Sequence, residues 1–248
     1  RNHMIGVTTL LAAAIEPLST RHSCSADTHG IREFERIARA VGHNTSRVDI
    51  RAITDKVTTH DYQLMYGTFL MPLRARSITL LEVGLGGCSE RYVKAKLTGR
   101  SAKVWPIVLP EARIWIADYE EKCARKLAGT FGPSVRLLYG DQKDPAVVQK
   151  WIGEIGTPLD VFIDDGAHTN KAILATFVVV WKALAPGGLY FIEDMHVLRT
   201  PATNDAANDD FVPDMLASWT DQLMAHPTND KQDLERSPNT ESHERAAA

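Results

Sequence analysis

Residues 159–196 read LDVFIDDGAHTNKAILATFVVVWKALAPGGLYFIEDMH. This stretch predicts a strand, an acidic turn, a helix, a second strand and a second acidic turn. LDVFID is a short apolar run that ends in carboxylates. The next apolar run has the length of a helix and is stopped by the Pro-Gly-Gly at 186–188. LYFIED then repeats the pattern of the first run. Two strands joined by a helix lie parallel through a right-handed crossover, so both acidic ends are expected at one edge of a sheet.

Chemically useful side chains gather at these two predicted strand ends. Asp164, Asp165 and His168 end the first strand, and Glu193 and Asp194 end the second. In open α/β sheets, ligands bind at the carboxyl edge of the strands. We therefore expect one site to draw on both ends.

Length and composition favour one α/β domain with peripheral additions. The chain has 248 residues, of which 44% are hydrophobic and 24% are charged. We expect an N-terminal extension with a helical lid at 1–50, the main domain at 51–226 and a disordered polar tail at 227–248. A net charge of -3 without clustered Lys and Arg argues against a nucleic-acid partner.

The spacing of the cysteines and the length of the N-terminal apolar run indicate in which cellular compartment the protein is expected. Cys24, Cys88 and Cys123 are widely spaced, which fits neither a CxxC metal site nor a fully paired disulfide framework, so a reducing, cytoplasmic location is expected. The apolar run at 5–15 is too short to span a bilayer, which predicts no membrane association. A secretory signal or anchor at 4–15 is the less favoured interpretation.

A glycine-rich turn follows the first predicted strand of the domain. ITLLEV at 78–83 is a buried-strand pattern, and Gly84, Gly86 and Gly87 let the backbone approach a ligand. A dinucleotide fingerprint would need glycine at position 89, which is Ser89, so a nicotinamide dehydrogenase is disfavoured. A plain turn is the alternative interpretation.

Two further strands end in aspartate. Asp118 ends the second strand, where it could accept hydrogen bonds from a ribose or cap a helix. Asp141 ends the third, where it could accept from an adenine amino group or serve as a turn residue. The run at 98–112 is expected to be an extra excursion between the first two strands.

Helical spacing of apolar residues predicts two helices before the sheet. Residues 31–42 are expected to form a lid or packing element that stops at Gly42. Residues 54–74 are expected to form one amphipathic helix that carries Tyr62 and covers the sheet.

Six segments occur in the order seen in a known family. They are TDKVTTHDYQLMY (54–66), LLEVGLGG (80–87), IADYE (116–120), YGDQ (139–142), IDDGAH (163–168) and PGGLYFIEDMH (186–196). In this order they resemble the macrocin/mycinamicin-type sugar O-methyltransferases, which are class I S-adenosylmethionine (SAM) methyltransferases. The resemblance covers about residues 50–197 of the sequence, and its most specific part is DDGxH followed by PGGxYxIED.

The resemblance implies a Rossmann-like fold with a parallel sheet in the order 3-2-1-4-5 and helices on both faces. It also implies Mg²⁺-assisted methyl transfer from SAM to a sugar or another small polyhydroxylated acceptor in natural product biosynthesis. By position, His168 resembles the general base, and the metal ligands are expected to be Asp165, Glu193 and Asp194. The expected cofactor contacts are Tyr62, Glu82, Gly84, Gly86, Asp118, Asp141 and Asp164.

The chemistry of these residues agrees with that implication. A sugar hydroxyl must lose its proton as it attacks a methyl group, so a base and a nearby positive charge both lower the barrier. Carboxylates are hard oxygen ligands suited to Mg²⁺, and imidazole is suited to proton transfer near neutral pH. Asp164 or Asp165 could instead cap the following helix, and His196 is expected to be exposed or to lie behind the site.

The family also has a closing pair of strands that the sequence after Asp194 does not predict. The fifth strand would then leave an open edge, which a partner chain, for example in a homo-oligomer, could cover. Because of this departure, a non-catalytic module that binds a nucleoside or a partner protein is the main alternative function. A metal-dependent hydrolase or oxygenase is a more distant one.

Overall fold

The computed structural model describes residues 28–41, 53–87, 98–200 and 211–224. It also gives the backbone of two short strands, β1 (His43–Asn44) and β2 (Arg47–Val48), which pair antiparallel. The apolar run at 5–15, the polar tail at 227–248, Cys24 and Cys88 lie outside the described residues.

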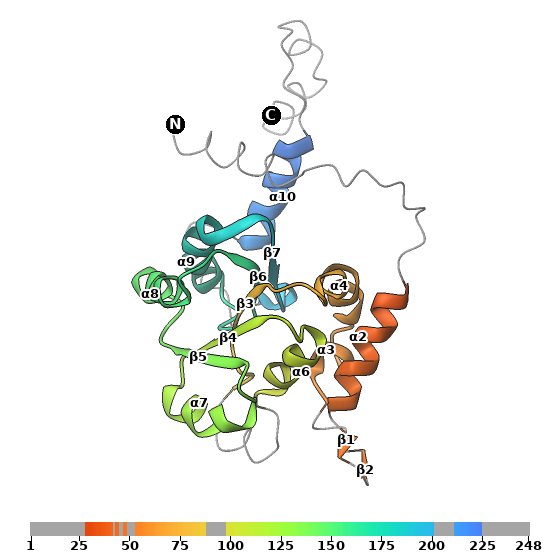
Figure 1. Cartoon of the computed structure of the whole chain (residues 1–248). Helices are drawn as coiled ribbons and strands as arrows, with labels where there is room; N and C mark the ends of the chain where they lie inside the picture. Colours follow the sequence, from red (N-terminus) through yellow and green to blue (C-terminus); the bar gives the residue numbers. More distant parts are fainter. Residues whose placement is uncertain are drawn as a thin grey trace, which may run out of the picture.

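A five-stranded parallel sheet forms the centre of the domain, in the order β5-β4-β3-β6-β7 (Figure 1). Numbered along the chain, this is the predicted order 3-2-1-4-5, and all four pairings are parallel. Within the described residues the sheet ends at β7. The strands are β3 (Thr79–Val83), β4 (Arg113–Asp118), β5 (Val135–Tyr139), β6 (Leu159–Asp164) and β7 (Leu184–Ile192).

Helices cover both faces of the sheet. One layer buries Phe34, Tyr66 and Trp105 against the sheet, and the other buries Trp151 and Val180. The first layer consists of α2 (Thr28–Val41), α4 (Gln63–Phe69), α6 (Arg100–Val108) and α7 (Glu121–Leu127). The second layer consists of α8 (Pro145–Ile155) and α9 (Asn170–Val180), and α10 (Val212–Met224) packs beside α9.

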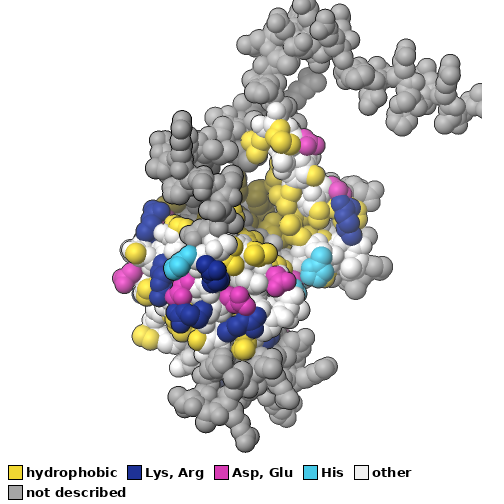
Figure 2. All heavy atoms as spheres, turned by 90° about the vertical axis from the view of Figure 1, so that its right-hand side faces the viewer, with side chains coloured by type: hydrophobic (Ala, Val, Ile, Leu, Met, Phe, Trp, Pro, Cys, Tyr) yellow, Lys and Arg dark blue, Asp and Glu magenta, His cyan; other side chains and the backbone are white. Residues whose placement is uncertain are grey.

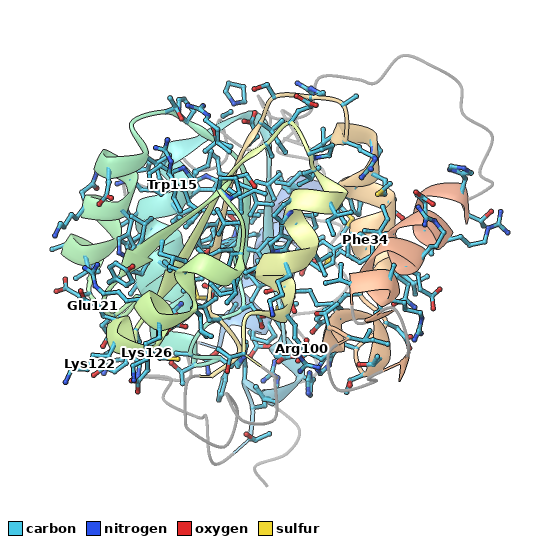
Figure 3. All side chains as sticks on the ribbon, turned by 60° about the horizontal axis from the view of Figure 1, so that its bottom comes forward. Phe34, Arg100, Trp115, Glu121, Lys122 and Lys126 are labelled. Carbon is cyan, nitrogen blue, oxygen red and sulfur yellow. The ribbon has the colours of Figure 1, made fainter. Side chains whose placement is uncertain are left out.

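The helices turn apolar side chains toward the sheet and charged side chains toward the outside. Figure 3 shows Phe34 on the inner side of α2, whereas Glu121, Lys122 and Lys126 point outward from α7. Figure 2 shows a face on which basic and acidic side chains are interspersed. No helix in the described part of the chain is both long enough and apolar enough to cross a membrane.

Strand alternation decides which layer each acidic side chain meets. Successive strand residues point to opposite faces. On β6, Ile163 packs in the α4 and α6 layer, so its neighbour Asp164 points toward α8 and α9. On β7, Phe191 packs in the α4 and α6 layer, and Glu193, two residues later, meets Tyr66 of that layer.

The prediction of one continuous helix at 54–74 is wrong, because the segment is broken into three pieces. They are α3 (Asp55–Thr58), α4 and a 3-10 turn, η2 (Met71–Leu73). The break lies at Thr59 to Tyr62, where Asp61 has a positive φ of 55° that a continuing right-handed helix cannot contain.

Two other local predictions also need correction. The helix that was expected to reach the Pro-Gly-Gly stretch ends earlier, at Val180, and a 3-10 turn, η4 (Trp181–Ala183), follows it. Strand β7 then begins at Leu184, because Pro186 disfavours helical backbone in the residue before it. The excursion expected at 98–112 is the crossover helix α6, which connects β3 to β4. Two further 3-10 turns are η3 (Ala128–Thr130) and η5 (Met195–Val197).

Candidate active site

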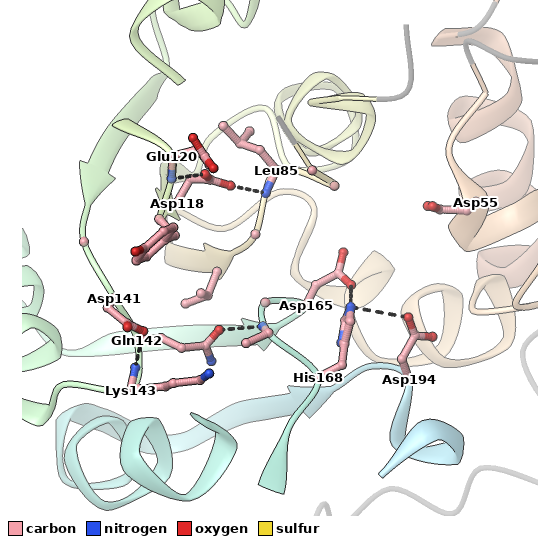
Figure 4. A pocket seen from close by; sticks show the side chains of 18 residues that line it. Asp55, Leu85, Asp118, Glu120, Asp141, Gln142, Lys143, Asp165, His168 and Asp194 are labelled. Carbon is pink, nitrogen blue, oxygen red and sulfur yellow. Dashed lines mark hydrogen bonds and ion pairs between the residues drawn. The ribbon is translucent and has the colours of Figure 1, made fainter. Parts of the chain in front are cut away.

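A cavity of about 650 Å³ lies at the carboxyl ends of the strands (Figure 4). Its volume falls in the range of small-molecule sites, roughly 300 to 1,000 Å³. The glycine turn after β3, the ends of β4 and β5, and the acidic turns after β6 and β7 all contribute to its wall. The lining residues are Asp55, Val83, Gly84, Leu85, Gly86, Gly87, Asp118, Tyr119, Glu120, Gly140, Asp141, Gln142, Lys143, Asp165, Gly166, Ala167, His168 and Asp194.

The glycine turn depends on a position that only glycine can occupy. Gly84 has a φ of 106°, and a Cβ atom built there would lie 2.1 Å from the backbone oxygen of Asp165. The turn after β3 therefore packs directly against the turn after β6. Gly86 and Gly87 also have positive φ, at 78° and 80°, so this backbone curves around the cavity.

The aspartates that end β4 and β5 hold the loops around the cavity. Asp118 accepts hydrogen bonds from the backbone N–H of Leu85 at 2.9 Å and of Glu120 at 2.7 Å. It does not cap α7, whose N-cap is Glu120. Asp141 accepts from the N–H of Lys143 at 2.9 Å, which is the turn role considered for it, and it also lines the cavity.

The turns after β6 and β7 bring Asp165, His168 and Asp194 together. The Nε2 atom of His168 lies 3.8 Å from Asp165 Oδ1 and 3.6 Å from Asp194 Oδ2. His168 and Asp194 both have positive φ, at 49° and 53°, a conformation that costs energy for residues other than glycine. Thr169 caps α9, so the interpretation of Asp164 or Asp165 as that cap is wrong.

A buried lysine occupies the space behind this group. Lys56 is 1% exposed, and its Nζ lies 2.9 Å from Asp165 Oδ2, 2.5 Å from Glu193 Oε1 and 3.4 Å from Glu82 Oε1. Burial alone would lower the pKa of Lys56, but the carboxylates of Asp165 and Glu193 raise it well above its ordinary value. Lys56 is therefore an ammonium ion inside the protein.

Glu82 and Glu193 face this lysine and do not line the cavity. Glu82 is fully buried, and its Oε2 accepts hydrogen bonds from Ser101 at 2.9 Å and from Trp105 Nε1 at 2.8 Å. Glu193 accepts from the hydroxyl of Tyr66 as well as from Lys56. Burial raises the pKa values of both glutamates, and Lys56 opposes that change.

Asp164 is buried on the opposite face of the sheet. Gln142 Nε2 donates to its Oδ1 at 3.0 Å, while Oδ2 has no hydrogen-bond partner among the described residues. Burial raises the pKa of Asp164 to about 6. The same Gln142 accepts from the N–H of Ala167 at 2.8 Å, and a Cβ on Gly166 would collide with it, so Gln142 fixes the DDGAH turn.

The broken segment at 54–74 holds Asp194 from the far side. The Tyr62 hydroxyl donates to Asp194 Oδ1 and accepts from the N–H of Asp194, both at 2.9 Å. His60 stacks on Tyr62, and its Nδ1 lies 3.5 Å from Asp194 Oδ1. His196 is 66% exposed, as expected, and its Nδ1 lies 3.9 Å from the same oxygen.

The structure thus divides the expected site residues into two sets. Those that line the cavity are Gly84, Gly86, Asp118, Asp141, Asp165, His168 and Asp194. Those that lie behind its wall are Tyr62, Glu82, Asp164 and Glu193. Sequence reasoning assigned no role to Lys56, Trp105 or Gln142. The lysine stands in the TDK segment of the family resemblance, and that position was the available signal.

Comparisons with known proteins agree with this geometry. The chain is 31% identical over 161 residues to 8-demethyl-8-alpha-L-rhamnosyl tetracenomycin-C 2'-O-methyltransferase of Streptomyces olivaceus, covering 65% of this chain and 40% of the relative. It is 26% identical over 192 residues to demethylmacrocin O-methyltransferase of Streptomyces fradiae, covering 75% and 46%. The resemblance to macrocin/mycinamicin-type sugar O-methyltransferases is confirmed. No protein family model matches the sequence.

A solved structure has the same fold. The MycE methyltransferase of the mycinamycin biosynthetic pathway, in complex with Mg and SAH (S-adenosylhomocysteine), superimposes with a TM-score of 0.60 at 25% identity, over 71% of this chain and 47% of that one. The chain has the fold of a SAM-dependent methyltransferase. A second MycE structure contains Mg, SAH and mycinamycin VI and superimposes with a TM-score of 0.59. The chain spans from 40% to 47% of the length of these proteins.

Proposed function

We propose that the chain is a SAM-dependent, Mg²⁺-assisted O-methyltransferase that acts on a hydroxyl of a sugar or another small polyhydroxylated metabolite. One observation carries the proposal. A single cavity is lined both by the glycine turn after β3 and by the Asp165, His168 and Asp194 group. A methyl donor and a metal-bound acceptor would thus share one site. Relatives that are named as methyltransferases of a rhamnosyl tetracenomycin and of demethylmacrocin support a role in natural product biosynthesis.

The cavity fits SAM at the end formed by β3, β4 and β5. Gly84 and Gly86 leave room for a ligand beside the backbone, and Asp118 and Asp141 supply acceptors for the hydroxyl and amino groups of an adenosine. Tyr119 lines the same end and is 71% exposed, so its ring is free to contact a base. Glu82 and Asp164 would support this region from behind its wall, whereas Tyr62 holds Asp194 at the opposite end.

The opposite end fits Mg²⁺. Asp165 and Asp194 line the cavity, and carboxylate oxygens are the ligands that Mg²⁺ prefers. We propose Glu193 as the third ligand through Oε2, because the described residues donate hydrogen bonds to its Oε1. When bound, SAM supplies the methyl group, and Mg²⁺ favours the ionised form of an acceptor hydroxyl.

His168 is the proposed general base. It lines the cavity, and its Nε2 faces carboxylate oxygens of both Asp165 and Asp194. The left-handed backbone at His168 places the ring beside these carboxylates, and Gln142 holds the turn that carries it.

Location in the cytoplasm remains a prediction from the cysteine spacing. Cys123 is disulfide-bonded in this structure. The mass of the chain, measured directly after cell lysis with and without reductant, would show whether the disulfide of Cys123 forms in cells. A chain without that disulfide in cells would support a reducing compartment.

Transfer of a labelled methyl group tests the function. The chain would be incubated with SAM carrying a labelled methyl group, Mg²⁺ and rhamnosylated polyketides, with Asp165→Asn as the matched variant. The proposal predicts label in the glycoside only with Mg²⁺ and only for the wild type. SAM binding without transfer to any glycoside would favour a non-catalytic binding module.

A further inference from the structure

The carboxylates behind the cavity wall form a cation position of their own. Ligand oxygens of Glu82, Asp165 and Glu193 all lie within 4.8 Å of one another. Lys56 Nζ lies 3.4 Å from an oxygen of Glu82, 2.9 Å from one of Asp165 and 2.5 Å from one of Glu193. We call Glu82, Asp165 and Glu193 the inner cluster. It holds a cation, and that cation is a side chain of the protein.

Glu82 shows that this position requires a positive charge. Its side chain is fully buried, and Oε1 has no hydrogen-bond partner among the described residues. Ser101 and Trp105 both donate to the other oxygen, Oε2. An unpaired, buried carboxylate oxygen is costly unless a cation compensates it. Glu82 Oε1 lies 3.4 Å from the ammonium nitrogen of Lys56, with which it forms an ion pair.

An outer cluster shares one residue with the inner cluster. Asp165, His168 and Asp194 also have ligand atoms within 4.8 Å of one another, and all three line the cavity. Asp165 divides its oxygens between the clusters, since Oδ2 accepts from Lys56 and Oδ1 faces His168. Lys56 and Glu82 do not line the cavity. An ion held in the inner cluster would therefore be out of reach of an acceptor.

We propose that Lys56 is a positioning residue that permanently fills the inner cation position and thereby keeps a divalent ion in the outer cluster, beside the acceptor. This inference rests on the proposed function only in placing Mg²⁺ at the outer cluster. A lysine suits the role because its ammonium is a compact charge with three donors. Held in place by the chain, it also orients Asp165 and Glu193.

Mn²⁺ binding to charge-matched variants tests the proposal. Mn²⁺ prefers the same oxygen ligands as Mg²⁺ and can be followed by water proton relaxation. Lys56→Met empties the inner cluster, Glu82→Gln removes one of its carboxylates, and the double variant does both. Circular dichroism recorded with and without Mn²⁺ serves as the control for the fold of each variant.

The proposal predicts that the effect of Glu82→Gln on Mn²⁺ affinity differs between the wild type and Lys56→Met. In the wild type, Glu82→Gln should change Mn²⁺ affinity much less than it does in the Lys56→Met background, because Glu82 faces the lysine and has no oxygen in the outer cluster. Lys56→Met should bind Mn²⁺ at least about tenfold more tightly, since three converging carboxylates are freed, and Glu82→Gln should reverse that gain. Relaxation per bound ion should fall in Lys56→Met, because the ion loses exchanging water in a buried position.

Three results would overturn the proposal. They are unchanged or weaker Mn²⁺ binding by Lys56→Met, a gain that does not depend on Glu82, and a Lys56→Met chain that fails to fold even in millimolar Mn²⁺. Failure of the proposed function looks different. In that case the wild type would bind neither SAH nor Mn²⁺, while the comparison of Lys56→Met with the double variant would still decide the role of Lys56.

Discussion

His168 and Asp165 are residues for which sequence and structure agree, and the reason is local. Both follow a buried strand within four residues, so the pattern of apolar residues alone places them at the carboxyl edge. Lys56 could not be placed in this way, because its partners Asp165 and Glu193 lie 109 and 137 residues further along the chain. Contacts of that kind depend on how layers pack, which periodicity does not encode.

His168→Gln should separate binding from chemistry. Loss of a general base lowers turnover by about 10² to 10⁴, while SAH affinity should stay within about threefold because the glycine turn is intact. His196→Gln is the control, since His196 is 66% exposed and 3.9 Å from Asp194. Single-turnover methyl transfer and calorimetry measure the two quantities. Full turnover in His168→Gln would mean that another group takes the proton.

Asp164 should make stability depend on pH. Its pKa is raised from 3.8 to about 6 by burial, so its neutral form is favoured in the fold. The contribution of neutral Asp164 to the free energy of unfolding is therefore fully present below pH 4 and is lost as the pH rises through about 6. Above that pH the buried charge costs about 3 kcal/mol of stability. Asp164→Asn stays neutral, so relative to wild type it should gain about 2 to 3 kcal/mol between pH 4 and pH 7.5.

Urea unfolding in the presence of a chelator measures that difference at both pH values. Any constant cost of the asparagine, such as an unpaired amide beside Gln142, cancels in the comparison. An equal difference between the two chains at both pH values would contradict the assignment.

At the scale of elements, turns and strand ends were predictable and helix boundaries less so. The glycine turn after β3 was predicted correctly, whereas the Pro-Gly-Gly stretch lies inside strand β7, and Asp61 breaks a segment for which helical spacing predicted one continuous helix. Helix α6 was mistaken for an excursion. Its amphipathic face includes Trp105 and Ser101, whose partner is the carboxylate of Glu82, an unusual acceptor inside a core.

Gly84→Ala should disrupt the packing of the turn after β3 on the turn after β6. The added Cβ would lie 2.1 Å from the Asp165 backbone oxygen. We expect a loss of about 3 kcal/mol or more and no detectable SAH binding. Gly132→Ala is matched, because Gly132 has a φ of 85° but open space around it, and it should cost about 1 kcal/mol with binding intact. Equal effects would show that backbone conformation, not packing, governs Gly84.

Trp105→Phe should weaken the link between α6 and β3. It removes a hydrogen bond of 2.8 Å to a buried carboxylate, whereas Trp151→Phe removes one of 3.0 Å to the neutral backbone oxygen of Tyr139. Both changes delete similar volume from buried positions. Because bonds to charged groups contribute more, Trp105→Phe should cost about 1 kcal/mol more in thermal unfolding. A smaller cost than that of Trp151→Phe would mean that the bond to Glu82 adds nothing.

The whole molecule joins two kinds of binding surface at one sheet edge. The parallel order of the sheet brings the ends of β3, β4 and β5 to one part of the cavity and those of β6 and β7 to the other. Strands that end in a glycine or carboxylate and lead into a helix predicted a parallel sheet, whereas its order 3-2-1-4-5 was what the family resemblance implied. The sequence did not predict that the segment at 54–66 covers the acidic ends, since that contact crosses the whole domain.

Calorimetric titration of SAM, with and without Mg²⁺, into wild type and Asp165→Ala is the most direct test. The account predicts SAM binding by the wild type in both conditions, and a separate heat for Mg²⁺ that Asp165→Ala abolishes. SAM binding without any Mg²⁺ heat would remove the metal from the proposed reaction. Absence of SAM binding by the wild type would contradict the central claim that this cavity is a methyltransferase site.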